Sequence, residues 1–170
     1  YPYPQVYHRE CKRDVFEELY PDLLEKKVAT VEELLAAIEN ADPAVPIVLT
    51  ANLVDVEPIQ IPEGKEVLLD LGGFNIDAAL RTEDRHYYAI DNYGSLILTG
   101  KGTISARGIE NFGTMVIEGE VEIIDIDTNG GAAIWNEGNL TINGGVFRTT
   151  HVGSPSDSYG SGCLNNSGIC

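Results

Sequence analysis

Two acidic side chains occupy equivalent positions in a repeated sequence, and they are the best candidates in this chain for acid–base chemistry. Asp91 and Glu110 each stand directly before an asparagine, in Ile-Asp-Asn-Tyr-Gly and Ile-Glu-Asn-Phe-Gly. Two carboxyl groups held side by side are what glycoside hydrolysis requires. His86 or Arg85 would be the nearest basic partner. Outward carboxylates are also common in an acidic chain, so the pair is a hypothesis to test and no catalytic residue is assigned.

A second run of acids copies the opening of a calcium-binding loop. The segment 125–130, Asp-Ile-Asp-Thr-Asn-Gly, has oxygen-bearing residues at alternate positions and a glycine where such a loop turns. Its twelfth position is Asn136 rather than glutamate, and no helix-loop-helix surrounds it. Three more carboxylates share one face of the preceding predicted strand: Glu118, Glu120 and Glu122. We interpret all these acids as the solvated outer face of a strand, and predict no metal or cofactor site.

Aromatic residues flank the same repeat position. Tyr93 and Phe112 each follow the repeated asparagine, and Trp135 stands where Asp91 stands in an earlier repeat. Exposed stacked rings bind sugars, whereas buried rings belong to a core or an interface. We favour a partly buried or subunit-facing role and keep a glycan as a possible partner.

These side chains belong to a sequence that repeats itself. The shared frame is apolar-x-Asn-x-Gly-x-apolar-x-apolar-x-Gly, with apolar residues two apart, as in a strand with one buried face. The copies run over 89–104, 108–123 and 133–147, a further copy begins at 163–170, and a weaker one covers 64–76. Such self-similarity indicates a solenoid, in which stacked copies bury a core that one copy could not bury alone.

One asparagine recurs in every full copy and predicts a column along the solenoid. If each repeat is one coil of a parallel β-helix, these residues stack at roughly 4.8 Å intervals, and each side-chain amide can donate to one neighbour and accept from the other. The competing interpretation is a set of independent turns in an antiparallel sheet, which would not require the same residue in each repeat. We therefore predict a structural ladder of Asn92, Asn111, Asn136 and Asn166.

The N-terminal part predicts a cap and an arm. Thr30 and Glu33 form a capping box before a helix over 29–41, with Val31, Leu34, Leu35 and Ile38 as its apolar stripe. We predict an arm over 1–28, a capping helix within 29–45 and a parallel β-helix over 46–170. The arm could be a docking segment or a lid on the solenoid, and its exposed aromatic residues would be Tyr1, Tyr3, Tyr7, Phe16 and Tyr20.

Composition limits the partners. A net charge of −16 opposes binding to nucleic acid or anionic lipid, and no apolar run is long enough to span a membrane. Cys163 and Cys170 flank one turn and could form a disulfide in an oxidising compartment; the favoured alternative is free thiols with Cys163 in the core. Tyr1 is not methionine, and Ile169-Cys170 supplies only the start of a strand. We expect a longer native polypeptide.

From Thr30 onward the chain resembles the right-handed parallel β-helix repeats of the pectin-lyase-like superfamily, in particular those of bacteriophage virion and bacterial surface proteins. The resemblance rests on the segment 61–76 and on repeats such as 133–147. No short catalytic signature of polygalacturonases or pectate lyases is present. Because this scaffold serves many functions, the resemblance implies a non-catalytic structural or adhesive module of a larger assembly.

The resemblance also implies a place for such a module. The leading expectation is a virion protein, as head decoration, fibre or tail component, which self-associates and binds other virion or surface proteins through its N-terminal arm. The alternatives are the N-terminal part of a polysaccharide-degrading spike or lyase, and a bacterial cell-surface adhesin. The expected location is the virion or an extracellular surface.

Overall fold

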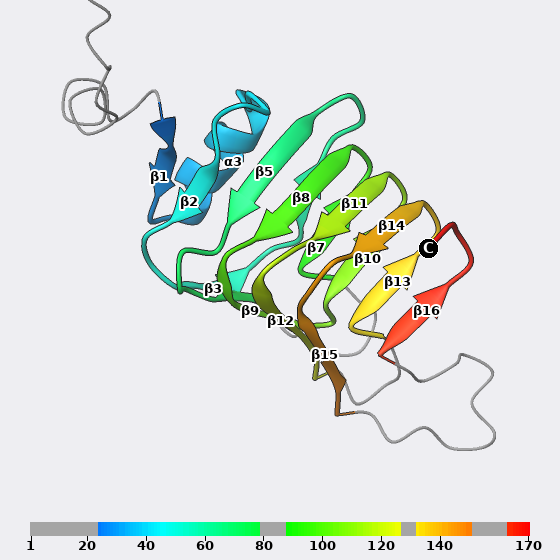
Figure 1. The fold of residues 1–170 in the computed structure, drawn as a ribbon. Helices are drawn as coiled ribbons and strands as arrows, with labels where there is room; N and C mark the ends of the chain where they lie inside the picture. Colours follow the sequence, from blue (N-terminus) through cyan, green and yellow to red (C-terminus); the bar gives the residue numbers. More distant parts are fainter. Residues whose placement is uncertain (1–23, 79–87, 127–131, 151–162) are drawn as a thin grey trace, which may run out of the picture.

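A computed structural model of the chain describes residues 24–78, 88–126, 132–150 and 163–170. These residues are mostly β-structure, arranged in three sheets that contain only parallel pairings. From residue 47 onward, successive strands along the chain pass from one sheet to the next, so that each sheet gains one strand per coil (Figure 1). This arrangement is consistent with a β-helix solenoid and excludes the alternative of an antiparallel sheet.

The three sheets keep the order of the coils. The first, in spatial order, contains β1 (Lys26–Val28), β2 (Ile47–Leu49), β5 (Glu66–Asp70), β8 (Ser95–Thr99), β11 (Thr114–Ile117) and β14 (Asn139–Ile142). The second contains β3 (Leu53–Val56), β6 (Ile76–Ala78), β9 (Lys101–Ala106), β12 (Glu120–Asp125) and β15 (Val146–Thr149). The third contains β4 (Ile59–Ile61), β7 (Ile90–Asn92), β10 (Ile109–Asn111), β13 (Ile134–Asn136) and β16 (Leu164–Asn166).

Alternation of side chains along each strand builds the core. In β8, Leu96 and Leu98 are fully buried, and in β11 Met115 and Ile117 lie beside them in register and are equally buried. The residues between them face outward, as Ile97 does with 37 % of its surface exposed. The two-residue spacing predicted from the sequence is therefore the spacing of the observed core.

Glycine is required at the corner after each ladder position because consecutive coils approach closely there. A Cβ atom on Gly113 would lie 2.0 Å from the carbonyl oxygen of Gly94, and one on Gly138 would lie 2.1 Å from that of Gly113. The same relation joins Gly168 to Gly138. No other residue type fits without separating the coils.

Helix α3 (Val31–Glu39) begins and packs as its sequence predicts, with one difference. The Thr30 hydroxyl accepts from the Glu33 amide at 3.2 Å, and the Glu33 carboxylate accepts from the Ala29 amide at 2.7 Å. Leu34 and Ile38 are buried in the same core as the strands, whereas Leu35, expected on the apolar stripe, is 45 % exposed. Its place on the buried face is taken by Ala37.

The last residues that the sequence assigned to the arm form a strand of the first sheet. Residues 26–28 form β1, which pairs in parallel with β2 and precedes α3 in the chain. The apolar Val28 is buried against the core, and this burial places the segment in the first sheet. The aromatic residues predicted for the docking arm lie in residues 1–23, outside the part of the chain that the structure describes.

Candidate functional site

A column of asparagines joins the coils inside the third sheet. The Nδ2 of Asn92 donates to Oδ1 of Asn111, Asn111 donates to Asn136, and Asn136 donates to Asn166, each at 2.6 Å. Each of the three donors also bonds to a main-chain carbonyl of the following coil, at 3.0 to 3.3 Å. Asn92, Asn111 and Asn136 are fully buried, and Asn166 is exposed. The ladder fixes the register of the coils and so positions the residues on either side of it.

The ladder begins with an unsatisfied group. Ile61 lies beside Asn92 in the parallel register, so no amide precedes Asn92 in the column. The Oδ1 of Asn92 is buried and accepts no hydrogen bond. A buried acceptor without a partner costs about 1–3 kcal/mol.

The acid pair, Asp91 and Glu110, lies one residue before the ladder and faces outward from adjacent strands. The two residues are direct partners in the register of β7 and β10. Partial burial raises the pKa of the Asp91 carboxyl. Burial also raises the pKa of Glu110, the neighbouring charges of Asp91 and Glu137 add to the effect, and Arg107 opposes it. Both carboxyls are therefore held toward their neutral forms.

Within the described residues, Arg107 is the basic group beside the acid pair. Arg85 and His86 fall outside the described residues. Arg107 acts on Glu110, and its guanidinium lies 5.2 Å from the centroid of the Tyr88 ring. Arg107 stands two residues before the β10 strand, a position that has no equivalent charge in the earlier repeat, so the sequence pattern gave no reason to choose it.

The aromatic pair, Tyr93 and Phe112, stacks on the outside of the coils. The ring centroids are 5.0 Å apart and the planes differ by 9°. Tyr93 is 44 % exposed and Phe112 is 37 % exposed, so both rings are partly open to solvent, and the subunit-facing role favoured from the sequence stays a prediction. Trp135 does not join the stack. It is half-buried, and its indole donates to the Glu137 carboxylate at 3.1 Å.

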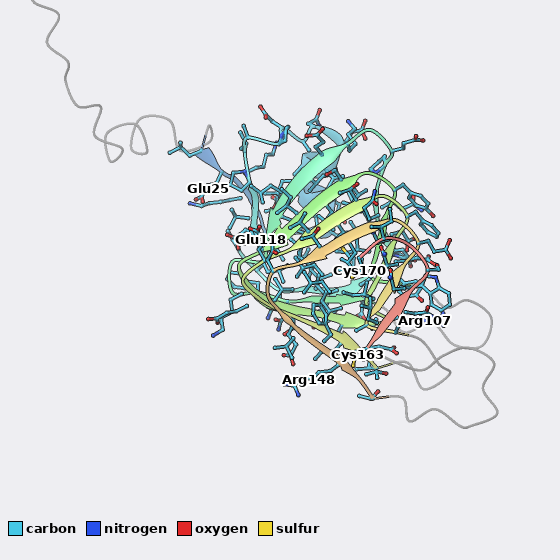
Figure 2. All side chains as sticks on the ribbon, turned by 45° about the vertical axis from the view of Figure 1, so that its right-hand side comes forward. Glu25, Arg107, Glu118, Arg148, Cys163 and Cys170 are labelled. Carbon is cyan, nitrogen blue, oxygen red and sulfur yellow. The ribbon has the colours of Figure 1, made fainter. Side chains whose placement is uncertain are left out.

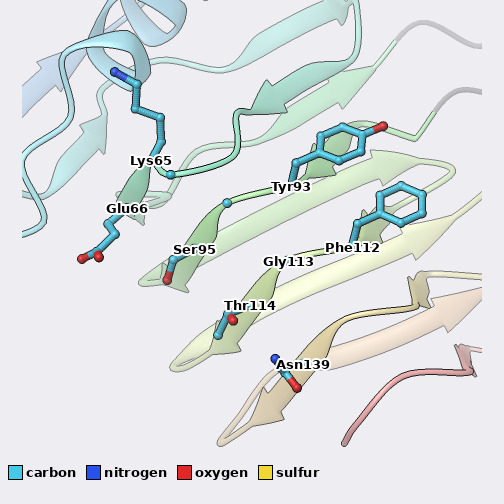
Figure 3. A pocket seen from close by; sticks show the side chains of 10 residues that line it. Lys65, Glu66, Tyr93, Ser95, Phe112, Gly113, Thr114 and Asn139 are labelled. Atoms are coloured by element: carbon cyan, nitrogen blue, oxygen red, sulfur yellow. The ribbon is translucent and has the colours of Figure 1, made fainter.

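An open hollow of about 320 Å³ lies beside the aromatic pair, at the corner between the third and first sheets (Figure 3). We call this hollow the corner groove. Residues 64–66, 93–95 and 112–114 and Asn139 line it. The register of the first sheet aligns the far bank as a polar column of Glu66, Ser95, Thr114 and Asn139.

Two charged side chains line the corner groove, and they differ in direction. Lys65 extends toward α3, where its ammonium donates to the carbonyl oxygen of Glu39 and lies 3.8 Å from that residue's carboxylate (Figure 3). Glu66 begins the polar column. The pKa of the Tyr93 hydroxyl is raised by desolvation and by the charges of Asp91 and Glu110. The acid pair therefore lies within electrostatic reach of the aromatic pair, although neither acid lines the groove.

The acidic residues between positions 118 and 125 differ in exposure: some face solvent, and one points into the core. Glu118 and Glu120 are exposed as predicted, and Glu122 forms an ion pair with Arg148. Asp125 is fully buried, because it follows Val121 and Ile123 on the inward face of β12, and it accepts from the Thr149 hydroxyl at 3.2 Å. The solvated role predicted for Asp125 is therefore wrong. Residues 127–131 lie outside the description, and the described residues contain no cluster suited to a metal ion.

The two cysteines of the last coil have free, exposed thiols (Figure 2). Of the two alternatives, the disulfide is not formed and the placement of Cys163 in the core is wrong. Cys163 directly precedes β16, at the repeat position where Ala133 is buried before β13, but every described residue of this last coil is half-buried or exposed.

Comparison of the chain with protein-family models, with curated proteins and with solved structures finds no match in any of the three. Within the residues that the structure describes, no helix is long and apolar enough to cross a membrane.

Proposed function

We propose that this chain is a non-catalytic, adhesive β-helix module of a larger assembly, and that it adheres through carbohydrate bound beside the aromatic pair. In this proposal the solenoid is a right-handed parallel β-helix, with α3 as its N-terminal cap. The leucine and isoleucine contacts of α3 with the core support the capping role. The resemblance to virion and bacterial surface repeats favours a virion component, with a cell-surface adhesin as the alternative.

The exposed stack of Tyr93 and Phe112 is the observation that carries the proposal. Large aromatic side chains are usually removed from water, and two that stack in the open beside a hollow indicate a binding surface. The rings stand on turns fixed by the ladder and by the glycine corners, so they are held rigidly without a ligand. A rigid aromatic surface loses little conformational entropy on binding.

Retention on immobilised polysaccharides tests this function. The wild-type chain should be retained on at least one polysaccharide gel, and Tyr93→Ala/Phe112→Ala should be released early. Val54→Ala is the matched control, because Val54 is an exposed apolar residue (62 %) in β3, a strand of the second sheet. Equal retention of the wild type and the double variant would contradict the proposal.

The assembly role has its own test. Replacing Tyr1, Tyr3, Tyr7, Phe16 and Tyr20 by serine should weaken self-association or binding to the partner protein, measured by light scattering and by co-purification from virions or cell envelopes. Retention on polysaccharide should not change in this variant, because residues 64–66, 93–95 and 112–114 with Asn139 line the groove. An unchanged assembly state would count against the arm as the docking element.

The acid pair favours one second function, glycoside hydrolysis. Two register-paired carboxyls with raised pKa values could provide a proton donor and a base. Release of reducing ends from a bound polysaccharide, lost in Asp91→Asn and in Glu110→Gln, would establish the hydrolase. Binding without release supports the adhesive module.

A further inference from the structure

The corner groove is repetitive in the direction of the solenoid axis. The two coils that carry Asn92 and Asn111 contribute the same three positions: a ring, a glycine and a hydroxyl residue. The aromatic pair forms one bank and the polar column forms the other. Each step along the groove is therefore one coil, roughly 4.8 Å.

A repeating groove with one aromatic and one hydroxyl-bearing bank matches the chemistry of a sugar chain. A pyranose ring has C–H groups that pack on aromatic rings and hydroxyls that exchange hydrogen bonds with Ser, Thr and Asn side chains. The aromatic bank covers two coils and ends where Glu137 replaces the ring and binds Trp135. The groove lining ends near the same place, at Asn139. Its length therefore suits two to three sugar units, at about one unit per coil.

Charge selects among sugar chains. Lys65 is the one cationic side chain in the groove lining, and it is directed at Glu39. Glu66 lies on the polar bank, and Asp91 and Glu110 act on Tyr93 from behind the rings. An anionic sugar would be repelled by these carboxylates, and the one cation of the described lining, Lys65, is already held by Glu39, so binding costs free energy. A cationic sugar would be attracted by the same carboxylates, so the charge of the groove excludes uronic acid chains and does not exclude amino sugars.

We infer that the corner groove binds an oligosaccharide without acid groups, laid along the solenoid axis across the coils of Asn92 and Asn111, and that it rejects uronic acid chains. This inference rests on the proposed adhesive function and specifies its ligand class. The rings of Tyr93 and Phe112 hold the sugar face, and Ser95 and Thr114 bond to its hydroxyls.

Calorimetric titration of the full chain with matched linear probes tests the inference. The uncharged probes are cello-, malto- and N-acetylchito-oligosaccharides of two to six units, the anionic probe is hexagalacturonate, and the cationic probe is the chitosan hexamer. At least one uncharged series should bind, with Kd falling about tenfold from two to four units and little beyond. Hexagalacturonate should bind at least about tenfold more weakly in low salt, and this difference should shrink as salt screens the carboxylates.

Variants locate the site and the selectivity. Tyr93→Ala should abolish binding of the uncharged probe, Thr114→Val should weaken it, and Val54→Ala should leave it unchanged. Glu66→Gln should leave the uncharged probe bound and should strengthen hexagalacturonate. Unfolding curves for each variant separate lost binding from lost folding.

The outcomes separate the two proposals. Hexagalacturonate binding as tightly as the best uncharged or cationic probe would overturn the inference and leave the adhesive function standing. An affinity independent of chain length would also overturn it, because it removes the axial arrangement. Absence of binding by every saccharide would overturn both.

Discussion

Ile61 lies directly beside Asn92 in the parallel register, at the position that asparagine holds in each later coil of the described chain. An apolar column thus changes into a hydrogen-bonded column between two neighbouring coils. The change leaves the Oδ1 of Asn92 buried without a donor. The ladder is directional, since the Nδ2 atoms of Asn92, Asn111 and Asn136 each donate to the asparagine of the following coil, so its first acceptor is the one group that no ladder amide can satisfy.

The first prediction concerns a donor for that acceptor. Ile61→Asn would place an Nδ2 beside the Asn92 Oδ1, and the new bond should offset part of the cost of removing a buried isoleucine. The same substitution in an Asn92→Leu background has no acceptor to satisfy. We expect a favourable coupling of about 1 kcal/mol in the double-mutant cycle, measured by denaturant unfolding of the four proteins. A coupling near zero would show that the Asn92 acceptor is not available to the preceding coil.

The second prediction is a gradient of stability along the ladder. Asn111→Ala removes two 2.6 Å bonds and leaves a buried donor on Asn92 and a buried acceptor on Asn136, so it should destabilise by about 2–4 kcal/mol. Asn166→Ala removes one such bond at an exposed site and should cost less than about 1 kcal/mol. Thermal unfolding checks both. Equal losses of unfolding free energy at the two sites would mean that burial does not determine how much each ladder hydrogen bond stabilises the fold.

The third prediction concerns the glycine corners. Gly113→Ala puts a Cβ atom 2.0 Å from the Gly94 carbonyl oxygen, and because both partners are backbone, the coils must move apart. We expect a loss of more than about 3 kcal/mol, or failure to fold. Gly73→Ala is the matched control: its φ of +91° is strained for alanine, but no atom lies within 4 Å of the new Cβ. It should cost about 1–2 kcal/mol, the price of backbone strain alone.

These relationships show which features the sequence could predict. A stacked parallel fold follows from repetition, because the apolar residues of every copy must meet in one core, and the repeated asparagine and glycine follow from the closeness of the coils. The inward position of Asp125 also follows from this alternation, because Asp125 continues the buried face of Val121 and Ile123, whereas Glu118 and Glu120 lie on outward positions; its charge favoured the solvated face instead.

The sequence predicted some features of the candidate site and not others. Register brings Asp91 to Glu110 and Tyr93 to Phe112, and this pairing follows from equivalent repeat positions. The exposure of the rings does not follow from the repeat positions, because it depends on the corner at which the chain leaves the third sheet. Arg107 could not be selected from the sequence either, because the other repeats carry no basic residue at the equivalent position.

The last prediction is a pH dependence set by the acid pair. The pKa of each carboxyl is raised in the folded chain, for Asp91 by burial and for Glu110 by burial and by the charges of Asp91 and Glu137. The folded state therefore binds more protons than the unfolded state, and the free energy of unfolding falls as the pH rises from the ordinary carboxyl pKa, about 4, through the raised values. Above that window both charges cost stability. Asp91→Asn and Glu110→Gln should each raise Tm by about 1–3 °C at pH 7, and the gain should vanish below about pH 4.

Glu118→Gln is the control for this effect, because Glu118 is an exposed carboxylate away from the pair, and its stability profile should follow that of the wild type. The coupling between the two acids has a direct readout. In Asp91→Asn, NMR titration of the Glu110 side-chain carbon should show a lower pKa than in the wild type, since one neighbouring negative charge is removed while Arg107 remains. A Glu110 titration that does not move would mean that burial alone raises its pKa, and the two carboxyls would then act as independent groups.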